Sequence, residues 1–283
     1  MNKTYSPLIS VIVTTYNRKN MLKDSILSIL NQTYSNFELI VVDNFSDYDF
    51  FNYIKSFNDS RIKPFQNKNN GIIAVNRNFG INKSNGELIA FCDDDDYWHK
   101  SKLSNQTLLF NESNTILVSS LALSVGENVN FFSKNYGFLY SKVRLNYESF
   151  IKVNPIILSS VMIRKDAIEK VNGFSENTNL IATEDYDLFL RLYDLGNFVL
   201  IKKLLVYYRF HSGSISKLKV GYKEKTNLKE IRKINETIVY NNLLKVLIKN
   251  CISFVLICKI RIVAFLSDLL NSKRLIYINT IQK

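Results

Sequence analysis

The chain has 283 residues, of which 46% are hydrophobic, and a formal net charge of +12. Its three prolines and nine glycines argue against long disordered linkers, and its length suits one large domain with or without an appendage. With three cysteines that form no Cys-x-x-Cys pair and only two histidines, the composition excludes a disulfide framework and a zinc site rich in either residue.

The positive charge is concentrated towards the C-terminus. Residues 216–283 contain 14 Lys or Arg and 4 Asp or Glu, a net charge of +10, whereas residues 1–215 contain 23 and 21, a net charge of +2. A uniformly basic nucleic-acid-binding protein would not show this distribution. The charge pattern therefore predicts a nearly neutral domain followed by a basic appendage.

The N-terminal part of the chain alternates between strand and helix patterns. Short apolar runs rich in β-branched residues predict buried strands at 8–14, 37–42, 61–65 and 88–92. Apolar residues at helical spacing predict helices at 20–30, 50–57 and 73–82. Alternation of this kind predicts an α/β fold with a mostly parallel sheet and right-handed crossovers. The first apolar run is also too short for a signal peptide.

The alternation ends after a helix predicted at 102–110. Residues 115–124 and 156–164 are strand-like, and 197–210 form one or two strands. Helices are predicted at 165–171 and 184–195, where glycines follow as stop signals. Residues 129–147 have no clear period and are a candidate for a loop that closes over a site.

Three polar loops follow predicted strands, at residues 14–18, 43–46 and 93–96. Ligands of parallel sheets bind outside the carboxyl ends of the strands, where these loops meet. The last loop is a run of four carboxylates, Asp93, Asp94, Asp95 and Asp96, directly after a buried strand. Like charges at a buried position are costly, and a divalent cation such as Mn²⁺ or Mg²⁺ would offset that cost. The alternative is a solvated acidic turn that caps the next helix.

The helix predicted from Glu184 has an informative pattern. Asp185 shares the apolar face with Leu188, Phe189 and Leu192, so it is expected to point inward. Asp187 is expected on the opposite, solvated face, paired with Arg191 at i+4. Glu184 and Asp185 have two possible roles: they either stabilise the helix N-terminus, as acidic residues commonly do, or act in catalysis.

Several motifs, taken in order, resemble family 2 glycosyltransferases, which are inverting enzymes with the GT-A fold. These motifs are ISVIVTTYNR (9–18), LSILNQTYSNFELIVVDN (ending at Asn44), NNG (69–71), RNFGI (77–81), GELIAFCDDDDYW (86–98), EDYDLFLRL (184–192) and YYRFHSGSIS (207–216). The resemblance covers about residues 8–216 and is carried by the joint order of the motifs. Bacterial surface-polysaccharide glycosyltransferases are the members it resembles.

The resemblance implies a role for each matching position. A nucleotide sugar, with uracil as the usual base, would be held by Thr14, Thr15, Tyr16, Asn17, Arg18, Asp43, Arg77, Asn78, Asp93 and Asp94. The metal would be held by Asp95 and Asp93 with His211 nearby, and Asp185 would be the general base beside Glu184. One departure is visible, because the family often has Asp-Asp-Gly-Ser where this chain has Asp43-Asn44-Phe45-Ser46.

The residue types fit that chemistry. A cation between the carboxylates and a diphosphate makes the nucleotide a better leaving group. A positioned carboxylate that takes the acceptor's proton contributes about 10²–10⁴-fold. The sequence therefore predicts a glycosyltransferase with a catalytic domain at 1–215, split into nucleotide-sugar binding (1–100) and acceptor binding (101–215). Its expected acceptor is a saccharide or lipid-linked saccharide in capsule, O-antigen or other surface-polysaccharide synthesis.

Three alternative functions predict different sequence features. Glycoside hydrolysis uses two carboxylates but needs no acidic cluster at a strand tip. A nucleotidyltransferase usually carries a glycine-rich phosphate loop, and the first loop here has no glycine. The non-catalytic alternative is a membrane-associated protein that binds sugar nucleotides.

The appendage at 216–283 is apolar in its second part, but lysines and arginines interrupt it. Its longest uncharged run in that part, residues 250–258, is far shorter than the roughly 20 residues of a spanning helix. Two roles stay open, packing onto the catalytic domain or a partner subunit, and docking on an anionic membrane. Because there is no disulfide framework, we expect a cytoplasmic protein. Docking of the appendage on an anionic membrane would place it peripherally at the inner face of the cell membrane.

Overall fold

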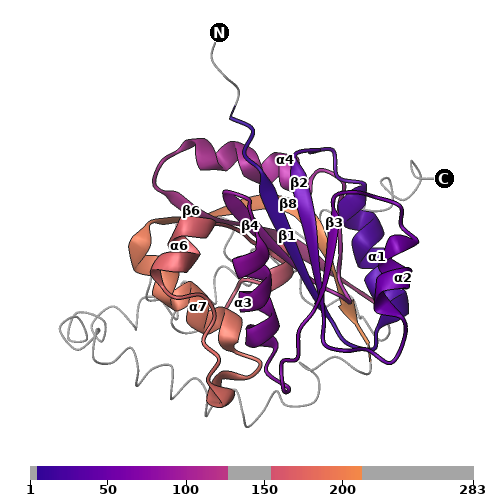
Figure 1. Ribbon diagram of the computed structural model, residues 1–283. Helices are drawn as coiled ribbons and strands as arrows, with labels where there is room; N and C mark the ends of the chain where they lie inside the picture. The colour runs from indigo at the N-terminus through magenta and orange to yellow at the C-terminus, as the bar shows by residue number, and fades with distance from the viewer. Residues whose placement is uncertain (1–4, 127–153, 212–283) are drawn as a thin grey trace. The chain divides into compact units, whose positions relative to one another are not determined.

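The computed structural model describes residues 5–126 and 154–211 (Figure 1). The closing loop predicted at 129–147 and the appendage predicted at 216–283 lie outside the described residues, as does the boundary between the domain and the appendage. All of the described residues belong to one compact unit, Met1–Ile231.

The predicted alternation of strands and helices is confirmed up to the acidic run. The elements are β1 (Ile9–Thr15), α1 (Lys19–Leu30), β2 (Phe37–Asp43), α2 (Phe50–Lys55), β3 (Ile62–Gln66), α3 (Ile73–Lys83) and β4 (Leu88–Asp93). β1, β2 and β3 run parallel to one another, and β4 runs parallel to β1. Because β1 and β2 are buried along their whole length, they carry continuous apolar runs rather than an alternating pattern.

The second half of the described chain extends the same sheet with mixed directions. Its strands are β5 (Tyr97–Trp98), β6 (Thr115–Gly126), β7 (Met162–Arg164) and β8 (Asn197–Phe210). The sheet has the order β3-β2-β1-β4-β7-β6-β8-β5. β7 is antiparallel to both β4 and β6, β8 is parallel to β6, and β5 is antiparallel to β8. The expected α/β fold is therefore confirmed: pairing is parallel throughout the N-terminal part and mixed in the second half.

Several predicted boundaries change. The helix predicted at 102–110 is α4 (Lys102–Thr107) followed by the 3₁₀ turn η1 (Leu108–Asn111), and the helix predicted from 184 is α7 (Glu184–Leu192) followed by η5 (Tyr193–Leu195). The strand expected at 156–164 is wrong for its first part, which contains the 3₁₀ turn η3 (Leu158–Ser160). That turn is fully buried, and a buried turn carries the same apolar pattern as a buried strand.

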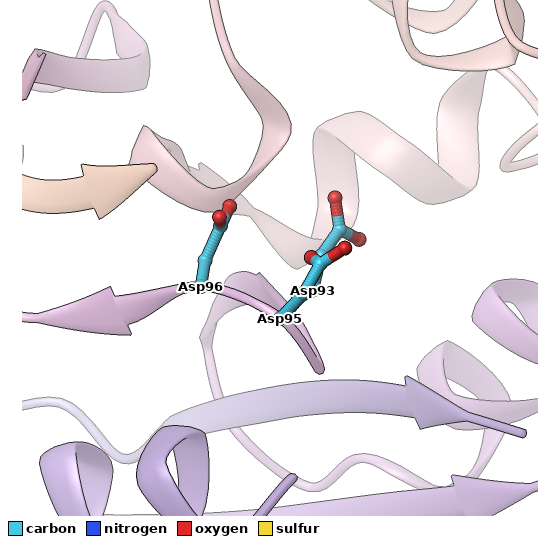
Figure 2. A group of neighbouring side chains, drawn as sticks. All are labelled: Asp93, Asp95 and Asp96. Carbon is cyan, nitrogen blue, oxygen red and sulfur yellow. The ribbon is translucent and has the colours of Figure 1, made fainter. Parts of the chain in front are cut away.

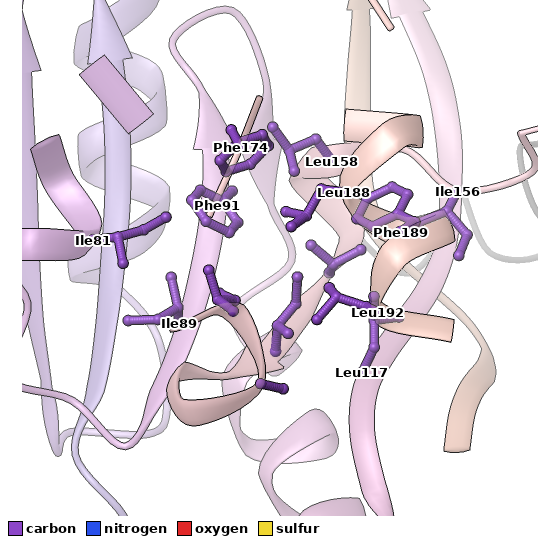
Figure 3. Packing of buried hydrophobic residues seen from close by; sticks show 14 of the residues in the cluster. Ile81, Ile89, Phe91, Leu117, Ile156, Leu158, Phe174, Leu188, Phe189 and Leu192 are labelled. Carbon is purple, nitrogen blue, oxygen red and sulfur yellow. The ribbon is translucent and has the colours of Figure 1, made fainter. Parts of the chain in front are cut away.

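Helices cover both faces of the sheet (Figure 1). Successive residues of β1 point to opposite faces, so Val11 and Val13 join one core cluster with residues of α1 and α2, whereas Ile12 joins the other with residues of α3 and α7. In the second cluster Phe91 of β4 meets Phe174 edge to face, with ring centroids 5.3 Å apart, beside Leu188 of α7 (Figure 3).

Two further elements complete that face, α6 (Lys165–Lys170) and the 3₁₀ turn η4 (Thr178–Leu180). Leu188, Phe189 and Leu192 of α7 are fully buried. Full burial of such a side chain contributes roughly 1.5–3 kcal/mol. This packing fixes the start of α7 relative to the sheet.

Candidate active site

The sheet register brings the three predicted polar loops to one edge. Thr15 at the end of β1 pairs with Asp43 at the end of β2, and Thr14 pairs with Asp93 at the end of β4. The parallel strands therefore end side by side, as the sequence predicted.

The loops after β1 and β2 are held together by side chains. The Asn17 backbone N–H donates to Ser46 Oγ at 2.8 Å, and Asn17 Nδ2 donates to Asp47 Oδ2 at 2.7 Å. In turn, the Asp47 N–H donates a hydrogen bond to Asn17 Oδ1 at 2.8 Å. Asn17 has a left-handed φ of 53°, which asparagine tolerates, and Tyr16 beside it keeps an exposed ring.

Asp43 is fully buried beneath these loops. Its carboxylate accepts from the Ser46 N–H at 2.9 Å, from Ser46 Oγ at 2.5 Å and from Gln66 Nε2 at 2.9 Å. A carboxylate has about four lone-pair sites, so most of its accepting capacity is used within the protein. The base contact predicted for Asp43 stays a prediction.

Asn44 and Phe45, where the sequence departs from the family pattern, have defined places in the structure. Asn44 Oδ1 accepts from the Asn69 N–H at 2.9 Å, so the amide joins the loop before α3 to this edge of the sheet. Phe45 takes a left-handed φ of 59°, a conformation that usually costs a non-glycine residue about 1–2 kcal/mol, and its ring is 55% exposed.

The acidic run forms a tight turn between β4 and β5, closed by the Asp96 N–H on Asp93 O at 3.1 Å. Asp94 is buried against the first loop and accepts from Thr15 Oγ1 at 2.8 Å and from Arg18 Nη1 at 3.0 Å. Asp95 also accepts from Arg18 Nη1 at 3.0 Å, and its Oδ2 lies 3.0 Å from His211 Nε2. Arg18 and His211 thus come to the acidic turn from opposite ends of the described chain.

Asp93, Asp95 and Asp96 each offer a carboxylate oxygen, and these oxygens lie within 4.8 Å of one another (Figure 2). Asp96 is fully buried, and its Oδ1 accepts the Arg209 N–H at 3.0 Å. Among the described residues, its Oδ2 has no hydrogen-bond partner. Three carboxylate oxygens at this spacing, two of them on partly exposed residues, fit a hard divalent cation.

Asp96 was not among the metal ligands predicted from the sequence, which were Asp93, Asp95 and His211. The available signal was its place as the fourth acid of the run. Its orientation depends on β8, because the Arg209 amide holds Oδ1.

Burial dominates the electrostatics of the turn. It raises the pKa of Asp94 to about 6, with the Arg18 guanidinium opposing it, and it raises the pKa of Asp93, with Arg77 opposing it. Burial and then the neighbouring carboxylates Asp95 and Asp93 raise the pKa of Asp96 well above its usual range. The turn therefore favours an added positive charge.

Arg77 links the acidic turn to the start of α7. Its buried guanidinium donates from Nη2 to Asp93 Oδ1 at 2.9 Å and from Nη1 to Glu184 Oε1 at 2.6 Å. Although burial works against the charge, the carboxylates of Asp93, Glu184 and Asp185 raise the pKa of Arg77. Residues separated by 107 positions in the sequence are thereby fixed in one ion-pair network.

Asp185 is partly buried at the first turn of α7, with Oδ1 accepting the Tyr186 N–H at 2.7 Å. Burial and the Glu184 carboxylate raise the pKa of Asp185 to about 7, while Arg77 opposes the rise. A carboxyl group that titrates near neutral pH is suited to proton transfer. Glu184, by contrast, is buried against Arg77.

The solvated face expected for Asp187 is wrong, although its pairing with Arg191 is confirmed. Asp187 is 4% exposed, and its Oδ2 accepts from Arg191 Nε at 3.0 Å and Nη2 at 2.7 Å. Arg191 Nη1 donates to Val171 O at 2.5 Å. The segment after α6 covers this side of α7, so Asp187 is buried while Arg191 stays partly exposed.

Asn78 follows Arg77 in the sequence but contacts a different part of the protein. Its Nδ2 donates to Phe174 O and to Glu176 Oε1, both at 2.9 Å, and its Oδ1 accepts from the Phe174 N–H at 2.8 Å. The structure does not bring this amide to the acidic turn, and these bonds give it a structural role.

Within residues 5–126 and 154–211, no helix combines the length and the apolar character that crossing a membrane requires.

Comparison with known proteins adds independent information. Residues 10–171 match the family model described as glycosyl transferase family 2. The chain is 30% identical over 256 residues to the Escherichia coli UDP-Glc:alpha-D-GlcNAc-diphosphoundecaprenol beta-1,3-glucosyltransferase WfaP, covering 87% of this chain and 97% of that protein. It is 28% identical over 230 residues to the Escherichia coli O-antigen biosynthesis glycosyltransferase WbnJ, covering 77% of this chain and 85% of the relative.

Other relatives match over a smaller part of their length. The chain spans 24% of an uncharacterized glycosyltransferase of Rickettsia bellii, at 37% identity over 171 residues and 60% of this chain. Among solved structures, S. aureus TarS 1-349 in complex with UDP-GlcNAc superposes with a TM-score of 0.62 at 20% identity, over 75% of this chain and 61% of that one. The mannosyltransferase PcManGT from Pyrobaculum calidifontis, in complex with GDP-Man and Mn²⁺, gives 0.59 at 16% identity, over 76% and 60%. These structures share the fold.

Proposed function

Because the chain belongs to glycosyl transferase family 2, we propose that it moves a sugar from a nucleoside-diphosphate sugar, with uridine as the nucleoside, to an acceptor hydroxyl, with inversion at the anomeric carbon. The observation that carries the proposal is the bridge made by Arg77, which joins the acidic turn through Asp93 to the start of α7 through Glu184. One site thereby combines a cation-binding turn with a carboxyl group suited to taking a proton.

The donor nucleotide would bind where β1 and β2 end. The loop 14–18 and Asp43 would contact the base, with the exposed ring of Tyr16 beside it. Arg77 and Asp93 would face the ribose and diphosphate side. This assigns donor binding to residues 1–100 and acceptor binding to residues 101–215 of the catalytic domain.

Asp93, Asp95 and Asp96 would hold Mn²⁺ or Mg²⁺, with His211 against Asp95. When bound, such a cation neutralises diphosphate charge and improves the leaving group. Arg18 contributes a fixed positive charge beside Asp94 and Asp95. The protein's own groups thus keep the turn in one geometry.

Asp185 would take the proton of the acceptor hydroxyl as that oxygen attacks the anomeric carbon. Its pKa near neutrality lets it be ionised before the step and hold the proton after it. Glu184 and Arg77 form the buried pair behind it, and the pair orients the start of α7. We expect this proton transfer to contribute about 10²–10⁴-fold to the rate.

We further propose that the enzyme works in bacterial surface-polysaccharide synthesis, on a lipid-linked saccharide acceptor. The similarity to WfaP, whose name specifies a diphosphoundecaprenol-linked acceptor, and to the O-antigen enzyme WbnJ supports this. A peripheral position at the inner face of the membrane suits such an acceptor, and the net charge of +10 in residues 216–283 would favour anionic lipid.

The test is a screen of nucleotide sugars with Mn²⁺ and a diphospholipid-linked N-acetylhexosamine acceptor, reading release of the nucleoside diphosphate and mass gain of the acceptor. We expect release with a UDP-sugar and a product heavier by one sugar. Asp185→Asn serves as the inactive control. Pyrophosphate release instead would indicate nucleotidyl transfer, and no nucleotide binding at all would overturn the proposal.

A further inference from the structure

Lys102, at the first position of α4, is a fully buried cation outside the machinery described above. Among the described residues, no carboxylate forms an ion pair with it. Its Nζ donates to Gln106 Oε1 at 2.7 Å, lies 3.4 Å from Val161 O, and sits 4.0 Å from the centroid of the Trp98 ring. Burial lowers the pKa of Lys102 to about 7, with Cys92 opposing the change. A buried lysine without an ion pair is costly, so its position calls for a physical reason.

The partners of Lys102 hold one short segment of the chain. Trp98 Nε1 donates to Ser159 O at 2.9 Å, and Gln106 Nε2 donates to Ser160 O at 2.8 Å and to Val118 O at 2.9 Å. With Lys102 on Val161 O, three consecutive carbonyls are each held by a different side chain. This anchoring fixes η3 where the sequence pattern predicted a strand.

The anchored segment in turn contacts the acidic turn. The buried Ser159 Oγ accepts the Asp93 backbone N–H at 3.0 Å, and the same hydroxyl contacts the Asp96 carboxyl group. On the other side of the turn, Trp98 lies two residues after Asp96, and its backbone N–H donates to Ser28 Oγ at 3.0 Å. The acidic turn is therefore fixed at both ends.

We propose that Lys102 and Gln106 are positioning residues, which set the spacing of the Asp93, Asp95 and Asp96 carboxylates by holding Ser159 against the turn. The inference rests on the proposed function for the role of those carboxylates. Cation affinity depends on oxygens already held at the right separation, so loosening Ser159 lowers affinity without removing a ligand. A lysine that served only the core would be replaced by an apolar side chain of similar length at no cost to the site.

The first test compares Lys102→Met with wild type in the full-length protein. Free Mn²⁺ is measured by electron paramagnetic resonance without any donor, and hydrogen exchange is measured on the peptide containing Asp93 in metal-free protein. We expect Mn²⁺ affinity about tenfold weaker, faster exchange at Asp93, and a melting temperature that is unchanged or higher, because a desolvated cation has been removed. Unchanged affinity and exchange would overturn the proposal.

Lys165→Met is the matched control. Lys165 also donates to a backbone carbonyl, Ser84 O at 2.7 Å, but that contact lies near the start of β4, away from the turn. Its Mn²⁺ affinity and Asp93 exchange should equal those of wild type. An equal loss in this variant would mean that the effect is general softening of the fold.

Ser159→Ala completes the experiment and serves alone if Lys102→Met fails to fold. It should weaken Mn²⁺ binding by a similar factor, and the double variant should be no worse than either single variant, because both act through one contact. Multiplicative losses would show that Lys102 acts by another route and would overturn the proposal.

Wild-type protein that binds Mn²⁺ but transfers no sugar would contradict the proposed function alone, whereas wild-type protein that binds no Mn²⁺ overturns this inference.

Discussion

Asp185 and Asp187, two positions apart on α7, should respond in opposite ways to the same chemical change. Asp185→Asn removes a partly buried carboxyl group whose Oδ1 accepts the N–H of the next residue, Tyr186. Asp187→Asn removes the buried half of an ion pair whose other half, the Arg191 side chain, is 26% exposed, and this pair holds Arg191 against the segment after α6. We expect the first to lose turnover and the second to lose stability.

The structure gives a magnitude for each effect. A hydrogen bond to a charged group contributes about 1.5–3 kcal/mol, and breaking a buried ion pair costs about 3–5 kcal/mol. Because an asparagine oxygen can still accept one bond from Arg191, we expect Asp187→Asn to cost about 2–3 kcal/mol. In a domain of this size that corresponds to a melting temperature lower by roughly 5–10 °C.

For Asp185 the sign follows from its raised pKa. The folded state binds the proton more tightly than the unfolded state, so wild-type stability falls as pH rises from the ordinary value of 3.8 to about 7. Asparagine does not titrate and removes this dependence. Asp185→Asn should therefore match or exceed the wild-type melting temperature at pH 8, while turnover falls by about two to four decades and donor binding is retained.

The assay measures melting temperature at pH 5 and pH 8 together with turnover at saturating donor. Asp166→Asn is the control, because Asp166 pairs with Lys170 at the same i, i+4 spacing but both side chains are 62% exposed. An exposed pair of this kind contributes at most about 1 kcal/mol. Wild-type melting of Asp187→Asn would contradict the buried ion pair, and a destabilised Asp185→Asn that keeps its turnover would contradict the role of Asp185.

Three further predictions use the same site and the C-terminal segment. Asp95→Asn should abolish transfer and Mn²⁺-dependent UDP binding while the melting temperature stays within a few degrees, and calorimetric titration of UDP with and without Mn²⁺ checks this. Phe45→Gly should relieve the left-handed φ of 59° at little packing cost, because the ring is 55% exposed, so thermal melting should show equal or higher stability; a clear drop would mean that the ring packs on the protein. Full-length protein should co-sediment with vesicles rich in anionic lipid and be released as salt rises, whereas a chain ending at Ser216 should stay in solution; equal binding to neutral vesicles, or none at low salt, would leave only a packing role for residues 216–283.

Sequence patterns alone suffice to predict the N-terminal architecture and the edge of the sheet where the site lies. Continuous apolar runs that end in polar residues mark buried parallel strands, and the ends of such strands must meet. The acidic turn, Asp43 and the loop at 14–18 could therefore be predicted as one group. Each of these signals is local, because it depends on residues adjacent in the chain.

Which side chains are buried, and which groups they pair with, depends on contacts between remote segments of the chain. Asp187 has the pattern of a solvated residue and Lys102 that of an ordinary helix-start lysine, but remote segments bury both. Arg77 pairs with Glu184, and Asp96 accepts a hydrogen bond from the Arg209 amide, although more than a hundred residues separate the partners in each case. The hydrophobic period of a helix or strand predicts which of its faces is apolar. It does not predict whether a segment from elsewhere in the chain buries the opposite, polar face.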